Sequence, residues 1–151
     1  MPWFTQEFRI NLLKINTMDL SQINYLAVLV AALSSFVIGF LWYAPFSFAN
    51  VWMREAGLSE EKIKQTSMIK TFGLSFLLAL IICFNLAAFL GPDAGLVWGI
   101  TAGALAGIGW AAASLGMIYL FEGRSFMLFL INAGYLAVTY AVAGGIIGVW
   151  Q

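Results

Sequence analysis

Few residues in this chain have the types and spacing that chemistry requires. Its 151 residues include no histidine and a single cysteine, Cys83, which lies within an apolar run. Because zinc and related metals are held by sets of imidazole, thiolate or carboxylate ligands, we expect no metal site and no cofactor. Glu122 and Arg124 are candidates for an acid–base pair, but a loop ion pair or a membrane anchor is the simpler interpretation. We therefore expect no catalytic residues and no enzyme, although serine chemistry assisted by a partner chain stays open.

Two amides inside long apolar segments are the most notable polar groups. Asn85 and Asn132 need hydrogen-bond partners in hydrocarbon, so each should face the helix bundle or another subunit. We favour interhelical hydrogen bonds, because no charged residue accompanies these amides in the apolar segments. The alternative is a small oligomeric transporter or channel for a neutral solute or ion, in which Asn85, Asn132, Thr101 and Ser114 line a path at a subunit interface.

Aromatic residues follow the first apolar segment closely. Trp and Tyr favour the headgroup level of a bilayer, and a proline biases the residue before it away from the helical region. Trp42, Tyr43 and Pro45 therefore predict a membrane exit, after which Trp52 lies along the surface or in a short re-entrant element. An ordinary aromatic belt explains this pattern, and a lid or a binding site is the alternative.

The elements that position these residues are four segments without Asp, Glu, Lys or Arg, at about 23–44, 71–92, 94–121 and 125–150. Each can span a membrane, because a helix needs about 20 apolar residues to cross the hydrocarbon. A chain with 62% hydrophobic and 9% charged residues is unsuited to a soluble fold, and without a basic stripe we expect no nucleic acid partner. We predict an all-α membrane protein, a four-transmembrane-helix bundle over residues 20–151 in the lipid bilayer.

The connections between the segments differ in length. Turn-forming residues at 91–95 and 122–125 predict two tight antiparallel hairpins. The only long loop, 45–70, is expected to be partly helical and to continue from about residue 60 as one helix to residue 90. Residues 1–19 have an amphipathic pattern that suits an N-terminal interfacial helix, or they are an extension upstream of the true start.

Lys and Arg counts predict the orientation of the bundle. The loops at 45–70 and 122–125 hold five of these residues, whereas the opposite side has only Arg9 and Lys14. Positive residues in short loops stay cytoplasmic. We therefore predict that both termini lie outside, and we expect a bacterial inner membrane location.

Glycines at four-residue spacing recur in the last two segments. Small residues at this spacing share one helical face and let helices approach closely. We favour small-xxx-small packing within the chain, and the alternative is a homo-oligomer seam. The glycines concerned are Gly99, Gly103 and Gly107 in the third segment, with Gly144 and Gly148 in the fourth.

Four short motifs in their order resemble the "domain of unknown function 1761" family of bacterial and fungal membrane proteins. The motifs are Trp42-Tyr43-Ala44-Pro45, Trp52-Met53, Asn132-Ala133-Gly134-Tyr135 and Gly148-Val149-Trp150, within residues 20–151. The resemblance implies a four-helix membrane protein and brings no activity or substrate with it. The function that we predict is a non-enzymatic membrane component that forms a homo-oligomer or joins a larger membrane complex.

Overall fold

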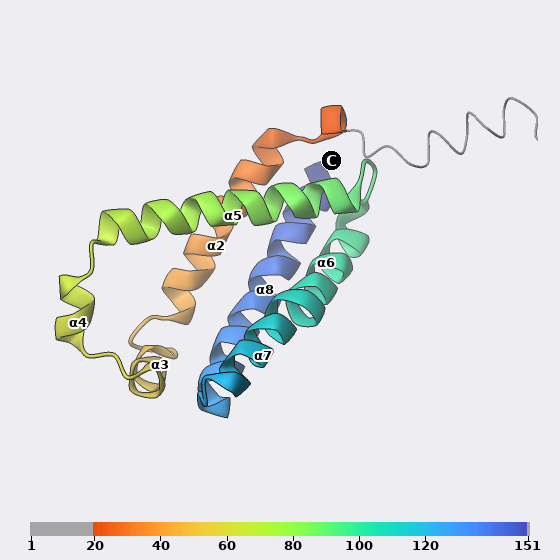
Figure 1. Ribbon diagram of the computed structural model, residues 1–151. Helices are drawn as coiled ribbons and strands as arrows, with labels where there is room; N and C mark the ends of the chain where they lie inside the picture. Colours follow the sequence, from red (N-terminus) through yellow and green to blue (C-terminus); the bar gives the residue numbers. More distant parts are fainter. Residues whose placement is uncertain (1–19, 151) are drawn as a thin grey trace, which may run out of the picture.

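The structure is a computed structural model that describes residues 20–150. After a short 3-10 turn, η1 (Leu20–Gln22), four helices within this range are long and apolar enough to cross a membrane, and none of these residues forms a strand. The four are α2 (Tyr25–Trp42), α5 (Met68–Leu90), the continuous helix α6 (Gly95–Ala106), η2 (Gly107–Ala112) and α7 (Ala113–Phe121), and α8 (Phe126–Trp150) (Figure 1). The predicted all-α class and its four spanning helices are confirmed. The interfacial helix expected at residues 1–19 lies outside the described residues.

Helices α6 and α8 form the most extensive contact in the bundle, and glycines lie along it. A Cβ added at Gly99 would overlap the carbonyl oxygen of Gly144, and one added at Gly103 would overlap that of Tyr140. At Gly107 the added atom would lie 2.9 Å from the carbonyl oxygen of Leu136. Because backbone meets backbone at these positions, the two helices can approach this closely only without side chains there.

Helix α5 packs into the bundle only over its C-terminal half. Its buried residues lie between Cys83 and Leu90, whereas Met68 to Ser75 are all exposed. Figure 1 shows the N-terminal half of α5 diverging from α2 and α8. The hydrophobic core therefore lies toward the end of the bundle where α2 begins and α8 ends, and there Asn24 Nδ2 donates to the Trp150 carbonyl oxygen at 2.8 Å.

The long connection contains two short helices, α3 (Ala49–Ala56) and α4 (Glu60–Gln65), and the single helix predicted from residue 60 to residue 90 is wrong. The chain turns to extended backbone at Thr66 and Ser67. Thr66 Oγ1 donates to the Lys62 carbonyl oxygen at 3.1 Å, and such local bonds from Ser and Thr compete with helix continuation. The Ser67 carbonyl oxygen then accepts from Thr71 N as α5 begins.

The third span carries a π-helical stretch, η2, that the sequence analysis did not anticipate. Such stretches are rare, and they usually occur as a single turn within an α-helix. Trp110 of this stretch is 63% exposed and packs edge-on against Phe89 of α5, with ring centroids 5.5 Å apart. The π turn therefore lies where the third span meets the packed half of α5.

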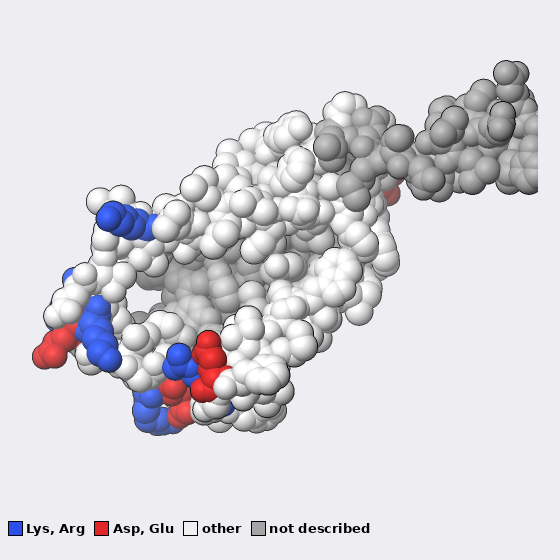
Figure 2. All heavy atoms as spheres, in the orientation of Figure 1, with Lys and Arg blue, Asp and Glu red and all other residues white. Residues whose placement is uncertain are grey.

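Charged residues concentrate at one end of the molecule. Figure 2 shows the Lys and Arg side chains near α3, α4, the start of α5 and the α7–α8 turn. The turn between α5 and α6, at the opposite end, contains Asp93 and no Lys or Arg. The antiparallel order of the spans brings both positively charged loops to the same end of the bundle.

Candidate functional site

The end of α2 is fixed by a compact turn that leads into α3. Ser47 N donates to the Ala44 carbonyl oxygen at 2.9 Å, and Phe48 N donates to that of Trp42 at 3.1 Å. Pro45 lies within this turn, where its fixed φ favours the change of direction. The turn places Trp42 and Tyr43 against α8 and brings α3 beside them.

Trp42 is anchored on the backbone of α8. Its Nε1 donates to the Ile131 carbonyl oxygen at 3.0 Å, and its ring packs on Phe48, with centroids 5.0 Å apart. A Cβ added at Gly134 would lie 2.9 Å from Trp42 Cζ2, so the absence of a side chain at Gly134 makes room for the indole. This bond joins the exit of the first span to the fourth span.

Tyr43 begins a chain of hydrogen bonds through the predicted amide site. Its hydroxyl donates to Asn132 Oδ1 at 2.8 Å, and Asn132 Nδ2 donates to the Tyr119 hydroxyl at 2.8 Å. The Tyr43 ring also packs against Trp52 and Tyr135, with centroids 5.2 and 5.3 Å apart. Asn132 thus makes the interhelical hydrogen bonds that the sequence suggested. Four candidate residues form one cluster beside Trp42: Tyr43, Trp52, Asn132 and Tyr135.

Above this cluster lies a cavity of about 930 Å³ between α2, α8 and the diverging half of α5, which we call the wedge cavity. Figure 2 shows the molecular surface hollowed below α5. Pro45 and Trp52 line its end toward α3, and Thr139 lies on its wall, 8% exposed. The lining also includes Ser35, Phe36 and Phe40 of α2, Thr71, Phe72, Ser75, Ala79 and Cys83 of α5, and Tyr135, Tyr140 and Ala143 of α8.

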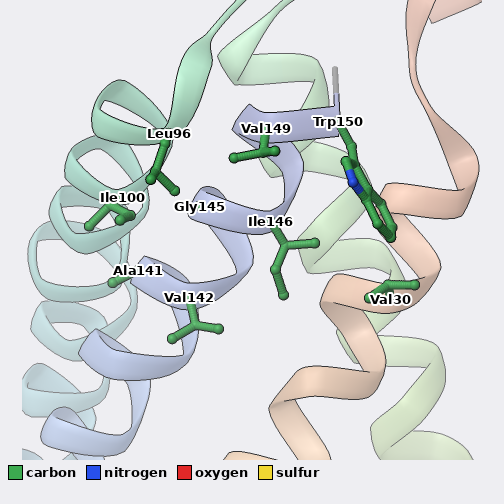
Figure 3. Close-up of a pocket in the computed structure, with 9 residues that line it drawn as sticks. All are labelled: Val30, Leu96, Ile100, Ala141, Val142, Gly145, Ile146, Val149 and Trp150. Carbon is green, nitrogen blue, oxygen red and sulfur yellow. The ribbon is translucent and has the colours of Figure 1, made fainter.

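A second recess, of about 510 Å³, lies at the other end of the bundle between α2, α6 and α8. Figure 3 shows Leu96 and Ile100 on α6, Gly145 and Val149 on α8, and the Trp150 indole beside α2. Its lining side chains are aliphatic apart from Trp150. This recess therefore offers a ligand far fewer polar contacts than the wedge cavity does.

Asn85 does not face the bundle, in contrast to Asn132. It is exposed, and its Nδ2 donates to the Ile81 carbonyl oxygen of its own helix at 2.8 Å. Thr101 is also exposed and donates to the Val97 carbonyl oxygen. Neither of the two cavities is lined by Asn85, Asn132, Thr101 or Ser114, so these residues form no common path in the single chain.

Glu122 and Arg124 pair with each other in the turn between α7 and α8. Arg124 Nε lies 3.0 Å from Glu122 Oε2, and both side chains are about half exposed, at 46% and 48%. Neither residue lines the wedge cavity. This geometry is that of a surface ion pair, which contributes little to stability.

The same turn is linked to α3 by a carboxylate that the sequence analysis did not single out. Arg54 Nη2 pairs with Glu55 Oε1 at 3.0 Å. The nearby Ser125 hydroxyl and this guanidinium hold the pKa of the Glu55 carboxyl below the ordinary value. Ser125 Oγ also accepts from Leu128 N at 3.1 Å, so it caps the start of α8. Glu55 therefore lies where α3 approaches the start of α8.

Two residues that contribute to the site were not proposed as site residues from the sequence. Tyr119 accepts a hydrogen bond from Asn132. The available signal was the tight turn at 122–125, which brings the end of the third span beside the start of the fourth. The second is Thr139, a polar residue within the fourth span. Nothing in its sequence neighbourhood distinguishes it from Thr101, which faces outward.

Comparison with known proteins gives one match. A family model described as "Protein of unknown function (DUF1761)" matches residues 26–148. No curated protein and no solved structure is significantly similar to the chain.

Proposed function

The chain belongs to this family of proteins of unknown function, and we propose that it acts, without catalysing a reaction, as an integral membrane component that associates with a second copy of itself. The same proposal covers association of this chain with other proteins in a larger membrane complex. The observation that carries it is the position of Asn85.

Asn85 is an amide on the outside of a spanning helix. It lies five residues before the end of α5, or about 7 Å along the axis, so it is within the apolar part of the helix. Its Nδ2 bond to Ile81 is the one hydrogen bond that this side chain makes among the described residues. An amide with unused hydrogen-bonding capacity is costly in hydrocarbon, and a second amide on a partner helix satisfies it.

The residues around Asn85 form a continuous outward ridge. Leu77, Ile81, Asn85 and Phe89 follow at four-residue spacing, which places them on one face of α5. Leu77, Ile81 and Phe89 are 56%, 57% and 48% exposed, and Asn85 is exposed as well. In a symmetric pair of α5 helices this ridge would pack on itself, with the two amides hydrogen-bonded to each other.

The glycine ladders argue for α5, rather than α6 or α8, as the interface. Gly99, Gly103 and Gly144 are already in contact within the chain, and an added Cβ at each would meet backbone of the other helix. Those faces are therefore occupied before a second copy arrives. The face of α5 around Asn85 is still largely exposed, and its one ring contact among the described residues is that of Phe89 with Trp110.

Disulfide crosslinking in native membranes tests the proposal. In a Cys83→Ala background, Ile81→Cys should give a crosslinked dimer, and Leu33→Cys, an exposed position on α2, serves as the matched control. Asn85→Leu should lower the association constant about threefold to thirtyfold, which corresponds to the ~0.6 to 2 kcal/mol of an interhelical hydrogen bond in a membrane. Equal crosslinking of Ile81→Cys and Leu33→Cys would refute self-association through this face.

For the orientation, we propose that the positively charged end is cytoplasmic. The Lys and Arg residues of the α2–α5 connection and of the α7–α8 turn lie at this end (Figure 2). Since positive residues resist translocation, the start of α2 and the end of α8 would then lie outside.

A further inference from the structure

We propose that the wedge cavity binds an uncharged lipid with a single hydroxyl or carbonyl group, and that Thr139 forms the hydrogen bond to that group. The cavity is of the size usual for small-molecule sites, about 300 to 1,000 Å³. It lies between helices of a membrane protein, so a molecule dissolved in the bilayer can reach it sideways. This inference does not depend on self-association.

Thr139 carries the polar part of the proposal. A threonine in a spanning helix ordinarily donates to a carbonyl oxygen one turn earlier, as Thr101 does to Val97 at 2.8 Å. Thr139 Oγ1 is buried and has no hydrogen-bond partner among the described residues. The Tyr135 hydroxyl donates its proton to the Ser35 carbonyl oxygen at 3.1 Å. It lies close enough to Thr139 to interact with it electrostatically, but Thr139 Oγ1 does not reach the geometry of a hydrogen bond to it. An unpaired buried hydroxyl is unfavourable, and a ligand group bonded to it would remove this cost.

The position of Thr139 defines where the polar group of the ligand must lie. Thr139 lies 13 positions after the first residue of α8 and 11 positions before the last, which corresponds to about 20 and 17 Å along the axis. Thr139 is therefore near the middle of the membrane. A phospholipid headgroup stays at the interface, whereas a neutral lipid with one weakly polar group can enter this depth.

The charge and shape of the lining support the same class of ligand. No Asp, Glu, Lys or Arg is among the residues that line the cavity, so a charged group would find no counter-ion. The lining combines small residues, Ala79, Cys83 and Ala143, with the aromatic rings of Phe36, Phe40 and Phe72. An elongated hydrocarbon tail fits these apolar walls, from Thr139 toward Pro45 and the surface.

Photocrosslinking with two matched probes tests the inference. The full-length protein in phosphatidylcholine vesicles would be exposed to a diazirine-bearing octadecanol or to the corresponding octadecane, and labelled peptides would be identified by mass spectrometry. We expect the alcohol to label segments 75–83 and 135–143. Thr139→Val should lower this labelling about fivefold, equivalent to a hydrogen bond of ~1 kcal/mol, and should leave labelling by octadecane unchanged.

Two further variants separate a specific site from general effects. Thr101→Val makes the same chemical change on an outward face and should not alter labelling. Ala79→Phe fills the cavity and should abolish labelling of both segments by the alcohol. Equal labelling of wild-type protein and Thr139→Val by the alcohol would overturn the proposal, because the cavity would then hold acyl chains without selection. Labelling confined to outward faces of the helices would overturn it as well.

Discussion

Replacement of Gly103 by alanine tests how tightly α6 and α8 pack. An added Cβ would overlap the Tyr140 carbonyl oxygen and would lie 2.9 Å from the carbonyl carbon and 3.2 Å from Ala141 Cα. Ordinary contacts begin at 3.4 Å, so the backbone of α8 must move away by at least about 0.5 Å. A gap of 0.5 to 1 Å forfeits roughly a quarter to a half of each dispersion contact along the seam. We expect destabilisation by about 1 to 3 kcal/mol.

Gly109 provides a matched control on the same continuous helix. Nothing lies within 4 Å of a Cβ added there, so Gly109→Ala has no packing cost and gains the helix propensity of alanine, about 1 kcal/mol. Both variants would be purified in detergent micelles, and SDS-induced unfolding would be followed by far-UV circular dichroism. Gly103→Ala should lower the free energy of unfolding and Gly109→Ala should raise it, so that the two variants differ by about 2 to 4 kcal/mol. If Gly103→Ala were as stable as Gly109→Ala, the close backbone contact would be refuted.

Three further predictions concern the exit of α2 and its loop. Tyr43→Phe and Asn132→Leu should each destabilise the protein, and a double-mutant cycle of SDS unfolding should give a coupling of about 1 kcal/mol; additive effects would contradict their hydrogen bond. The lowered pKa of Glu55 means that its carboxylate stabilises the folded state at pH above its ordinary 4.5, and this contribution is lost as the pH falls through the lowered pKa. Hydrogen exchange of α3 should accordingly rise on acidification in the wild type and depend less on pH in Glu55→Gln. A cysteine at Gln65, in a Cys83→Ala background, should resist a membrane-impermeant thiol reagent applied from outside, and rapid labelling would reverse the proposed orientation.

The spanning helices could be predicted because the information is local. A run of about 20 residues without charge has no stable alternative in a membrane but a helix. Helix starts are local as well: Ser59 and Ser125 are of a residue type favoured at N-caps, and both accept hydrogen bonds from the first turns of their helices. The break at Thr66 was missed because the hydrophilic stretch and the apolar stretch each favour helix, and extended backbone at two residues leaves no hydropathy signal.

The candidate site was predicted in part. Aromatic residues after α2 and the amide at Asn132 were singled out from the sequence, and the structure brings them together through Tyr43. Asn85 had the same chemistry and a similar setting in the sequence, yet it lies on the outside of the bundle. Residue type indicates that an amide needs a partner, but the rotation of its helix about its axis decides which partner it meets.

The sequence by itself determined the number of spans, their class and the scarcity of titratable groups within them, because each of these depends only on neighbouring residues. Tertiary structure alone decided that α5 packs over half its length, that a cavity opens beside the other half and that Thr139 lies on the cavity wall without a partner. These properties depend on the tilt and register of one helix against another. Contacts between residues far apart in the sequence, such as Gly103 with Tyr140, set that tilt and register.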